Sequence, residues 1–173
     1  MGTSRSDHEP NPAPRDVNGR PVSRSRWQRL TARIGSRSVP EAIGVDDDDL
    51  EVIASCDDDA ASSSTVLEGS SWRPQDQAVV RHHLVLPISR VSDAIAVAAL
   101  DGYRPVLQEH DGPVPDGHEA LVLARVQLVD ALHLSQERSR MASLGSRHDG
   151  RAVGWQVLQR AGKTDHSGGR TSG

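Results

Sequence analysis

Apolar residues follow two different spacings along the second half of the chain, and together these spacings predict six elements of secondary structure. The segments VVRHHLVL (79–86), ALVLARV (120–126) and RAVGWQVLQ (151–159) are short and rich in Val and Leu, as strands are. Residues 103–108 predict a further short strand. In residues 88–103 and 129–150 the apolar residues recur at steps of three and four, which predicts helices. The order is therefore β-α-β-β-α-β.

This order predicts an α+β fold, a ferredoxin-like βαββαβ sandwich over residues 77–160, with two helices on one face of a four-stranded sheet. Right-handed crossovers make the two strands joined by each helix parallel neighbours. Ser89 is the expected N-cap of the first helix, and Gly102 is expected to end it in the left-handed conformation. The second sheet face stays open unless another segment covers it, and the preceding acidic segment is a candidate for part of that cover.

The segments around this domain have biased compositions. Residues 1–44, rich in Pro, Ser, Arg and Gly, are expected to form a disordered basic arm, and residues 161–173 a disordered Gly/Ser-rich tail. Within the arm, Trp27, Leu30 and Ile34 have the spacing of a short basic helix. Residues 45–76 form an acidic segment, in which Asp46 to Asp49 are expected to begin a short helix that ends near Cys56.

Charge is strongly segregated, although the net charge of the chain is only −4. Residues 1–40 hold eight Arg and three acidic residues, whereas residues 41–76 hold eleven acidic residues and one Arg. Such blocks are typical of interaction segments. A single cysteine rules out an internal disulfide and favours the cytoplasm, as do the missing membrane-length apolar run and secretory signal. The bias towards Arg, Ala, Gly and Val suggests a GC-rich bacterial genome.

Two adjacent histidines, His82 and His83, lie in the first predicted strand. Because successive strand residues point to opposite faces, His82 joins the apolar face under the helices, whereas His83 lies beside Arg81 on the open face. The two rings cannot easily chelate one metal ion. His82 is therefore expected to be a buried neutral imidazole with a hydrogen-bond partner, and His83 a candidate for contact with a partner.

Other polar residues receive ordinary structural interpretations. The loop residues His110, Asp111, Asp116, His118 and Glu119 lack a metal-binding spacing and are expected to be solvated. His133, Glu137 and Arg140 are expected to share an exposed helix face. Arg138 is different because it falls on the apolar stripe of its helix, formed by Ala131, Leu134, Arg138, Met141 and Gly145. Its guanidinium either extends to the sheet edge or faces a partner.

No catalytic motif is present in the sequence, and no cofactor or metal is expected. The first and third predicted strands carry no aromatic residues, so the open face offers only Arg81, His83 and Arg125 for weak stacking on RNA bases. RNA binding is therefore expected, if at all, through residues 1–40. A small enzyme using His82 or His83 with the 110–119 loop is a further, less favoured alternative.

The motifs RHHL in the first strand, DGY after the first helix, and GRAVGW in the last strand resemble the regulator of ribonuclease activity B family in order and spacing. The resemblance covers residues 77–158, and residues 46–76 would correspond to the family's N-terminal helix. The positions that match the shared motifs are His82, His83, Leu84, Gly102, Tyr103, Gly154 and Trp155. In contrast to enterobacterial members, whose tail is strongly acidic, the acidic residues of this chain precede the domain.

The resemblance implies a non-enzymatic regulator that binds an RNase E-type endoribonuclease and inhibits its cleavage of RNA. An acidic stretch would suit a basic partner surface and speed the encounter at low salt. The candidate partner-binding residues are Arg81, His83, Arg138, Asp46, Asp47, Asp48, Asp49, Asp57, Asp58 and Asp59. The alternatives are RNA binding through the arm and a small histidine- or metal-dependent enzyme.

Overall fold

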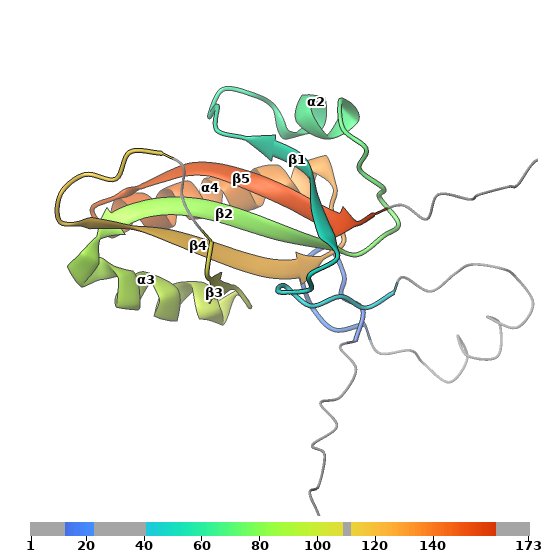
Figure 1. The fold of residues 1–173 in the computed structure, drawn as a ribbon, viewed down its shortest axis with the longest axis horizontal. Coiled ribbons are helices and arrows are strands. Elements are labelled where there is room, and N and C mark those ends of the chain that lie inside the picture. Colours follow the sequence, from blue (N-terminus) through green and yellow to red (C-terminus); the bar gives the residue numbers. More distant parts are fainter. Residues whose placement is uncertain (1–12, 23–40, 109–111, 162–173) are drawn as a thin grey trace, which may run out of the picture.

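The computed structural model describes residues 13–22, 41–108 and 112–161. Within these residues, a five-stranded antiparallel sheet is combined with three helices, in an α+β arrangement (Figure 1). Along the chain, the elements are β1 (Leu50–Cys56), α2 (Ser63–Glu68), β2 (Ala78–Pro87), α3 (Ile88–Leu100), β3 (Arg104–Val106), β4 (His118–Gln127), α4 (Ala131–Arg147) and β5 (Arg151–Arg160).

The sheet has the strand order β1-β5-β2-β4-β3, and every neighbouring pair is antiparallel. The six predicted elements are present in the predicted order. The sheet has five strands instead of four, however, because β1 adds to the outer edge of β5. The strands joined by a helix are also not neighbours: β4 lies between β2 and β3, and β2 lies between β4 and β5. Each crossover therefore spans one intervening strand.

All three helices contribute to the cores on one face of the sheet. Under α3 and α4, Leu84 and Leu86 of β2 pack with Ala94, Ala98 and Met141. Under α4 and α2, the core is formed by side chains of β1, β2 and β5 together with both helices, namely Ala54, Val80, Trp155, Val157, Leu67 and Leu134. The strand alternation read from the sequence is thus confirmed for β2, whose Leu84 and Leu86 face the helices.

The opposite face is partly covered by residues 41–49. Ile43 and Val45 are buried against Val79, Val126 and Leu158, which belong to the three central strands β2, β4 and β5. The expected cover by the acidic segment is present in part, through Val45, whereas Ile43 belongs to the arm that was expected to be disordered. The cover is provided by these two apolar residues, which precede the aspartates.

The predicted helix over residues 46–56 is wrong. Leu50–Cys56 is strand β1, which pairs with β5 from Leu50↔Arg160 to Cys56↔Trp155. β-branched residues such as Val52 and Ile53 favour a strand. The helix of this segment comes later, at Ser63–Glu68, where the Ser62 side chain accepts a hydrogen bond from the Thr65 backbone N–H at 3.1 Å.

Two further expectations need correction, and one is confirmed. Residues 13–22 and 41–44 have a defined structure, in contrast to the disorder expected for residues 1–44. Ser89 does not cap α3, because the helix begins one residue earlier, directly after Pro87. The expected left-handed conformation of Gly102 is confirmed by its φ of 80°. The predicted helix at residues 27–34 and the tail at 162–173 lie outside the described residues.

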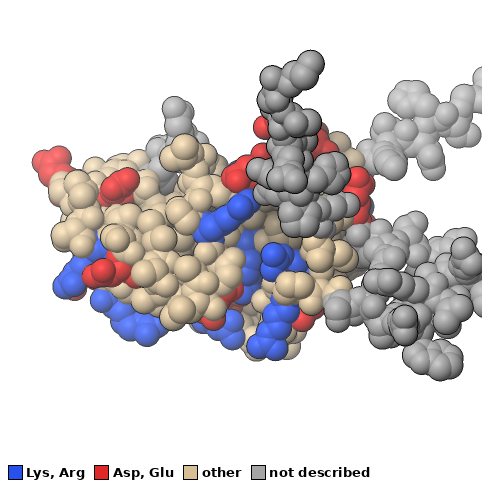
Figure 2. Space-filling view, turned by 90° about the horizontal axis from the view of Figure 1, so that it is seen from below, with Lys and Arg blue, Asp and Glu red and all other residues tan. Residues whose placement is uncertain are grey.

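The outer surface of α3 is largely uncharged. Ile88 and Val97 are exposed, and Leu100 is 86% exposed. Seen from below, uncharged residues cover much of the left half of the surface, although acidic and basic residues lie at its left end and lower edge (Figure 2). Further acidic residues lie towards the right (Figure 2). Since α3 already packs on the sheet through Ala94 and Ala98, these exposed residues are not needed for the core.

Candidate functional site

The two histidines point to opposite faces of the sheet, as their alternation predicts. His82 is buried on the helix face, at 1% exposure, whereas His83 is half-buried on the other face. Each histidine belongs to a different group of polar residues. The candidate site therefore has two parts: a buried ionic cluster around His82 and a pocket beside His83.

The buried cluster is centred on Glu137 of α4. Its Oε1 accepts hydrogen bonds from Arg125 Nη2 at 2.5 Å and from Gln127 Nε2 at 2.8 Å. Its Oε2 accepts one from the Tyr103 hydroxyl at 2.8 Å and lies 3.7 Å from His82 Nε2. All five residues are buried, so a charged carboxylate is compensated here by a charged guanidinium and neutral donors.

Arg125 connects this cluster to its surroundings. Its Nε donates to Gln127 Oε1 at 2.8 Å, its Nη1 donates to the Asp101 carbonyl at 2.8 Å, and its Cζ lies 4.5 Å from the centre of the Tyr103 ring. The guanidinium is thus held by hydrogen bonds and by a cation–π contact. Its orientation is determined by groups from β4, α4 and the end of α3.

The cluster shifts the pKa of two of its members. Burial alone would raise the pKa of Glu137, but the polar contact with His82 and the charge of Arg125 hold that pKa below its ordinary value. Burial and the negative charge of Glu137 raise the pKa of the Tyr103 hydroxyl. The cluster therefore favours an ionised Glu137 beside a neutral Tyr103.

In this conformation the cluster presents no surface to a substrate. Glu137 is 2% exposed and Arg125 is 5% exposed, and residues 13–22 lie over the Arg125 stem. Nor does His82 make the expected hydrogen bond through Nε2, since that atom has no partner within bonding distance. The geometry supports a role for these residues in joining α4 to the sheet.

The cluster was missed in the sequence because both of its charged members were expected at the surface. Glu137 is not on an exposed helix face, because it follows Leu134 by three residues and precedes Met141 by four. Arg125 is not on the open face, because it lies on the same face of β4 as the buried Leu121 and Leu123, which are four and two residues before it. The spacing of apolar residues along α4 and β4 therefore predicts that both charged side chains are buried.

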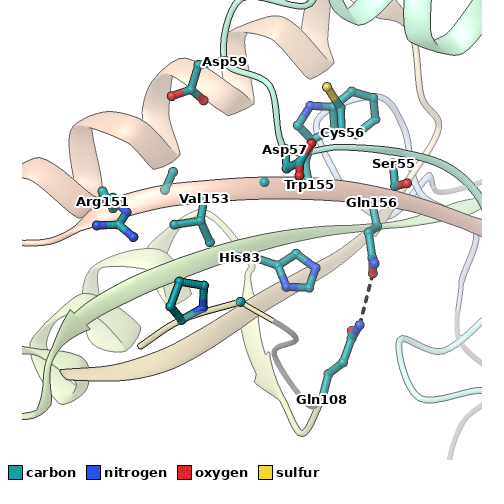
Figure 3. Close-up of a pocket in the computed structure, with 14 residues that line it drawn as sticks. Ser55, Cys56, Asp57, Asp59, His83, Gln108, Arg151, Val153, Trp155 and Gln156 are labelled. Carbon is teal, nitrogen blue, oxygen red and sulfur yellow. Dashed lines mark hydrogen bonds between the residues drawn. The ribbon is translucent and has the colours of Figure 1, made fainter. Parts of the chain in front are cut away.

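On the opposite face, a pocket of about 630 Å³ lies over β5 between the end of β1 and β2 (Figure 3). His83 pairs across the strands with Gly154, and the Gly154 backbone approaches Asp57 on its other side. We refer to this hollow as the open-face pocket. Its charged and polar lining includes His83, Asp57, Asp59, Arg151 and Gln156.

Gly154 contributes to the pocket through its missing side chain. A Cβ at this position would lie 3.1 Å from the Cys56 carbonyl oxygen and 3.5 Å from the Asp57 Cα. A larger residue would therefore press on the end of β1 and occupy the space between Asp57 and His83. Gly154 is one of the positions that carry the family resemblance, and this geometry is a structural reason for a glycine there.

A polar chain continues from the pocket across the sheet. Arg81 Nη1 donates to Gln108 Oε1 at 3.0 Å, and Gln108 Nε2 donates to Gln156 Oε1 at 3.3 Å. Arg81 Nη2 also donates to the Val45 carbonyl at 3.4 Å, and burial lowers the Arg81 pKa despite the opposing charge of Asp46. Arg81, a candidate for partner contact, thus already has partners within the chain.

The first group of aspartates is held by arginines of the same domain. Asp47 Oδ2 and Asp49 Oδ2 lie 3.0 and 2.7 Å from the Arg160 guanidinium, and Asp46 Oδ2 lies 3.2 Å from Arg104. Burial opposes the charge on Arg160, but these carboxylates outweigh it and raise the Arg160 pKa. Asp48 is exposed. Most of this group therefore fastens the residues before β1 to the sheet.

The second group, Asp57, Asp58 and Asp59, is exposed at the end of β1, and we call it the aspartate corner. Of its side chains, only that of Asp58 has a hydrogen bond within the described residues, from Ala60 N at 2.8 Å. The backbone of the corner is nevertheless held, because Arg138 Nη2 donates to the carbonyls of Asp58 and Asp59 at 3.3 and 3.2 Å.

Arg138 itself faces this loop. Its Nη1 donates to the Ala61 carbonyl at 2.7 Å, and its Cζ lies 5.7 Å from the centre of the Trp155 ring. Of the two alternatives read from the sequence, the side chain thus extends along the sheet edge. The guanidinium orients the loop that displays the aspartate corner.

The remaining candidates do not gather at one place. Within residues 13–22, 41–108 and 112–161, no three His, Cys, Asp or Glu side chains have a metal-binding arrangement. His118 Nδ1 lies 3.1 Å from the Asp116 carbonyl, and Glu119 is exposed, while His110 and Asp111 lie outside the described residues. The Cys56 thiol donates to the Asp58 carbonyl at 3.4 Å.

No helix in the described part of the chain is long and apolar enough to cross a bilayer. Comparison with family models, curated proteins and solved structures finds no match to this chain. The chain is therefore characterised by its α+β fold and by the buried cluster and the open-face pocket alone. The resemblance to the ribonuclease regulators rests on the sequence motifs.

Proposed function

We propose that the chain is a non-enzymatic, cytoplasmic regulator that binds an RNase E-type endoribonuclease through the aspartate corner and the adjoining open-face pocket, and so inhibits cleavage of RNA. The fold class would be a ferredoxin-like sandwich extended by β1. The proposal combines the motif resemblance with the location of the exposed charges. His83 lies in the pocket beside the corner, where a bound partner segment would reach it.

The observation that carries the proposal is the difference between the two groups of aspartates. Three carboxylates of the first group are already paired with Arg104 and Arg160. Within the described residues, the carboxylates of Asp57 and Asp59 have no ion pair or hydrogen bond. An unpaired carboxylate can meet an incoming cation without first breaking an existing pair.

The arrangement also supports binding because Arg138 orders the loop in advance. Four hydrogen bonds from one guanidinium hold the loop backbone and Ser63, so less conformational entropy is lost when a partner binds. Exposed like charges at such a site mainly accelerate encounter with a basic surface, and the acceleration declines with added salt.

The test is retention of the host's RNase E-type enzyme on the immobilised chain, together with its cleavage rate on a defined RNA. The triple variant D57N/D58N/D59N should lower retention about tenfold or more at low salt and relieve inhibition. The control D93N/D116N/E119Q removes the same charge from three other exposed acidic residues. Equal retention by wild type and both variants would exclude the corner, and no retention by any of them would exclude the proposal.

Direct contact of residues 1–40 with RNA is the competing explanation of any change in cleavage. It is separated by replacing Arg5, Arg24, Arg26, Arg29, Arg33 and Arg37 with Gln in the full chain. If this variant loses both RNA retention without enzyme and all inhibition, the chain acts by sequestering RNA. If inhibition persists, contact with the enzyme is responsible.

A further inference from the structure

Residues 13–22 form a compact turn that lies against the end of the sheet, and we call this segment the strap. Arg15 and Pro21 form an isolated antiparallel bridge, and Asp16 Oδ1 accepts hydrogen bonds from the backbone N–H groups of Asn18 and Arg20 at 2.9 and 2.8 Å. Gly19 completes the turn at a φ of 71°, a conformation that favours glycine. The strap is therefore locally shaped before it contacts the domain.

The domain binds the strap through its backbone. Gln77, only 3% exposed, accepts a hydrogen bond from Arg15 N at 2.7 Å and donates one to the Arg15 carbonyl at 2.8 Å. Leu128 N donates to the Asp16 carbonyl at 3.2 Å. One side-chain amide thus pairs with both the backbone N–H and the backbone C=O of one residue, as a neighbouring strand would. The domain therefore recognises the backbone at Arg15, while Asp16 and Gly19 give the bound turn its shape.

Gly19 is the only buried residue of the strap, and it packs on the Arg125 side chain. A Cβ on Gly19 would lie 2.7 Å from Arg125 Cδ and 2.8 Å from Arg125 Nε. The strap therefore covers the buried Arg125–Glu137 pair at its outer end. Glycine is required both by the backbone conformation and by the close approach to Arg125.

No apolar anchor holds the strap in place. None of its residues belongs to the three hydrophobic cores of the described chain, and Val22 is 43% exposed. A cavity of about 590 Å³ lies beside it, lined by Arg15, Gly44, Asp46 and Arg125 among others. Segments held by a few hydrogen bonds and no apolar contact open at a much lower free energy than the core. Hydration of Arg125 on opening further offsets the lost contacts.

We propose that Gln77, the Leu128 N–H and the Arg125 stem form a docking site for an extended peptide with a glycine at its turn, and that the strap occupies this site as a releasable intramolecular ligand. Release uncovers Arg125 while the sheet stays folded. A partner that binds the released state more tightly than the docked state shifts the population towards release. The docking site is distinct from the aspartate corner, so the two proposals succeed or fail separately.

The first test is hydrogen exchange of the full-length wild-type chain. The Leu128 and Gly19 amides, whose acceptor is the Asp16 carbonyl, should exchange about 100-fold or more faster than the paired amides of β2 and β4, because the strap opens without global unfolding. If the Leu128 amide exchanges as slowly as those strand amides, the strap is a fixed part of the fold and the proposal is overturned.

The second test restores the ligand from solution. In full-length Gly19→Val, the strap should be displaced, and a synthetic peptide of residues 13–22 should shift the NMR signals of the Leu128 amide and the Gln77 side chain. Wild type should bind the peptide at least about tenfold more weakly than Gly19→Val does, because its own strap competes for the site. Gly117→Val is the control, since Gly117 also has a positive φ but no atom within 4 Å of its added Cβ.

The variants also define the outcomes that contradict the docking site. A folded Gly19→Val chain that fails to bind the peptide overturns the proposal. So does equal binding by G19V/Q77A, because the Gln77 amide would then not be the recognition element. Equal binding of a scrambled peptide indicates non-specific contact and has the same consequence. If Gly19→Val does not fold, the exchange measurement on wild type decides.

Discussion

Arg125 on β4 and Glu137 on α4 form a hydrogen-bonded ion pair of 2.5 Å in the core, with side chains that are 5% and 3% exposed. The pair links the central part of the sheet to the longest helix of the described chain. Removing two charges from water costs several kcal/mol per ion, and the cost is recovered only where the geometry is good and the remaining polar atoms are satisfied. Gln127, Tyr103 and the Asp101 carbonyl provide that satisfaction.

Breaking the pair from one side should be strongly destabilising. Glu137→Leu leaves the Arg125 charge buried without its carboxylate and should lower the free energy of unfolding by about 3–5 kcal/mol. The double variant R125M/E137L removes both charges and should recover most of that loss. Urea unfolding at neutral pH measures each variant. Additive losses in the double variant would show that the two charges do not act as a pair.

The pair should also make stability depend on pH in the acid range. The pKa of Glu137 is lower in the folded chain than the value of about 4.3 in an unfolded chain. The stabilisation by its ionised form is therefore fully present above that unfolded value and is lost as the pH falls through the folded-state pKa. Urea unfolding between pH 7 and about pH 3 should show this loss in wild type and a smaller one in Glu137→Gln. Identical profiles would contradict the assignment.

Tyr103 should resist ionisation until the chain unfolds. Its pKa is raised above the unfolded value of about 10 by burial and by Glu137. The stability contributed by the neutral phenol is present below about pH 10 and is lost as the pH rises towards the folded-state pKa. Tyr103 is the only tyrosine, so phenolate absorbance reports this residue alone. The absorbance change should coincide with loss of circular dichroism, and phenolate formation in a still-folded chain would refute the prediction.

Strongly periodic segments were predictable from the sequence, whereas pairings between distant residues were not. The alternation in β2 and the three- and four-residue steps in α3 and α4 identified these elements, because burial of one face dictates the spacing. β1 was misread since its preceding aspartates suit a helix N-terminus equally well. The deciding contacts are with Arg160, more than a hundred residues away, as for Asp47 at a separation of 113.

The candidate site shows the same limit. The opposite orientations of His82 and His83 follow from strand alternation alone. Glu137 and Arg125 were assigned to the surface because charged residues are rarely buried unpaired. Their pairing depends on how α4 is rotated over β4, which a single sequence does not reveal. The strap was missed for a related reason, since Gln77 binds Arg15 across 62 residues.

Arg138 should control the order of the aspartate corner more than global stability. Arg138→Gln removes most of the hydrogen bonds to the carbonyls of residues 58, 59 and 61, so the loop should exchange hydrogen and be cleaved by proteases faster. The free energy of unfolding should fall by only about 1–2 kcal/mol. Arg140→Gln, an exposed neighbour on the same helix, is the control. Unchanged exchange in residues 57–62 of Arg138→Gln would contradict this role.

Two glycines should differ sharply in their tolerance of alanine. A Cβ on Gly150 would lie 2.2 Å from the Val85 carbonyl oxygen and 2.9 Å from the Leu86 Cα, both backbone atoms of the central strand β2. Since the strand cannot move aside cheaply, Gly150→Ala should cost more than about 3 kcal/mol, above the usual range for overpacking. Gly117→Ala meets no atom within 4 Å and carries only the strain of a φ of 74°, which costs about 1–2 kcal/mol. Thermal and urea unfolding of both variants measure the difference. Equal losses would mean that the turn between α4 and β5 can shift away from β2, so that the close approach at Gly150 does not limit the packing there.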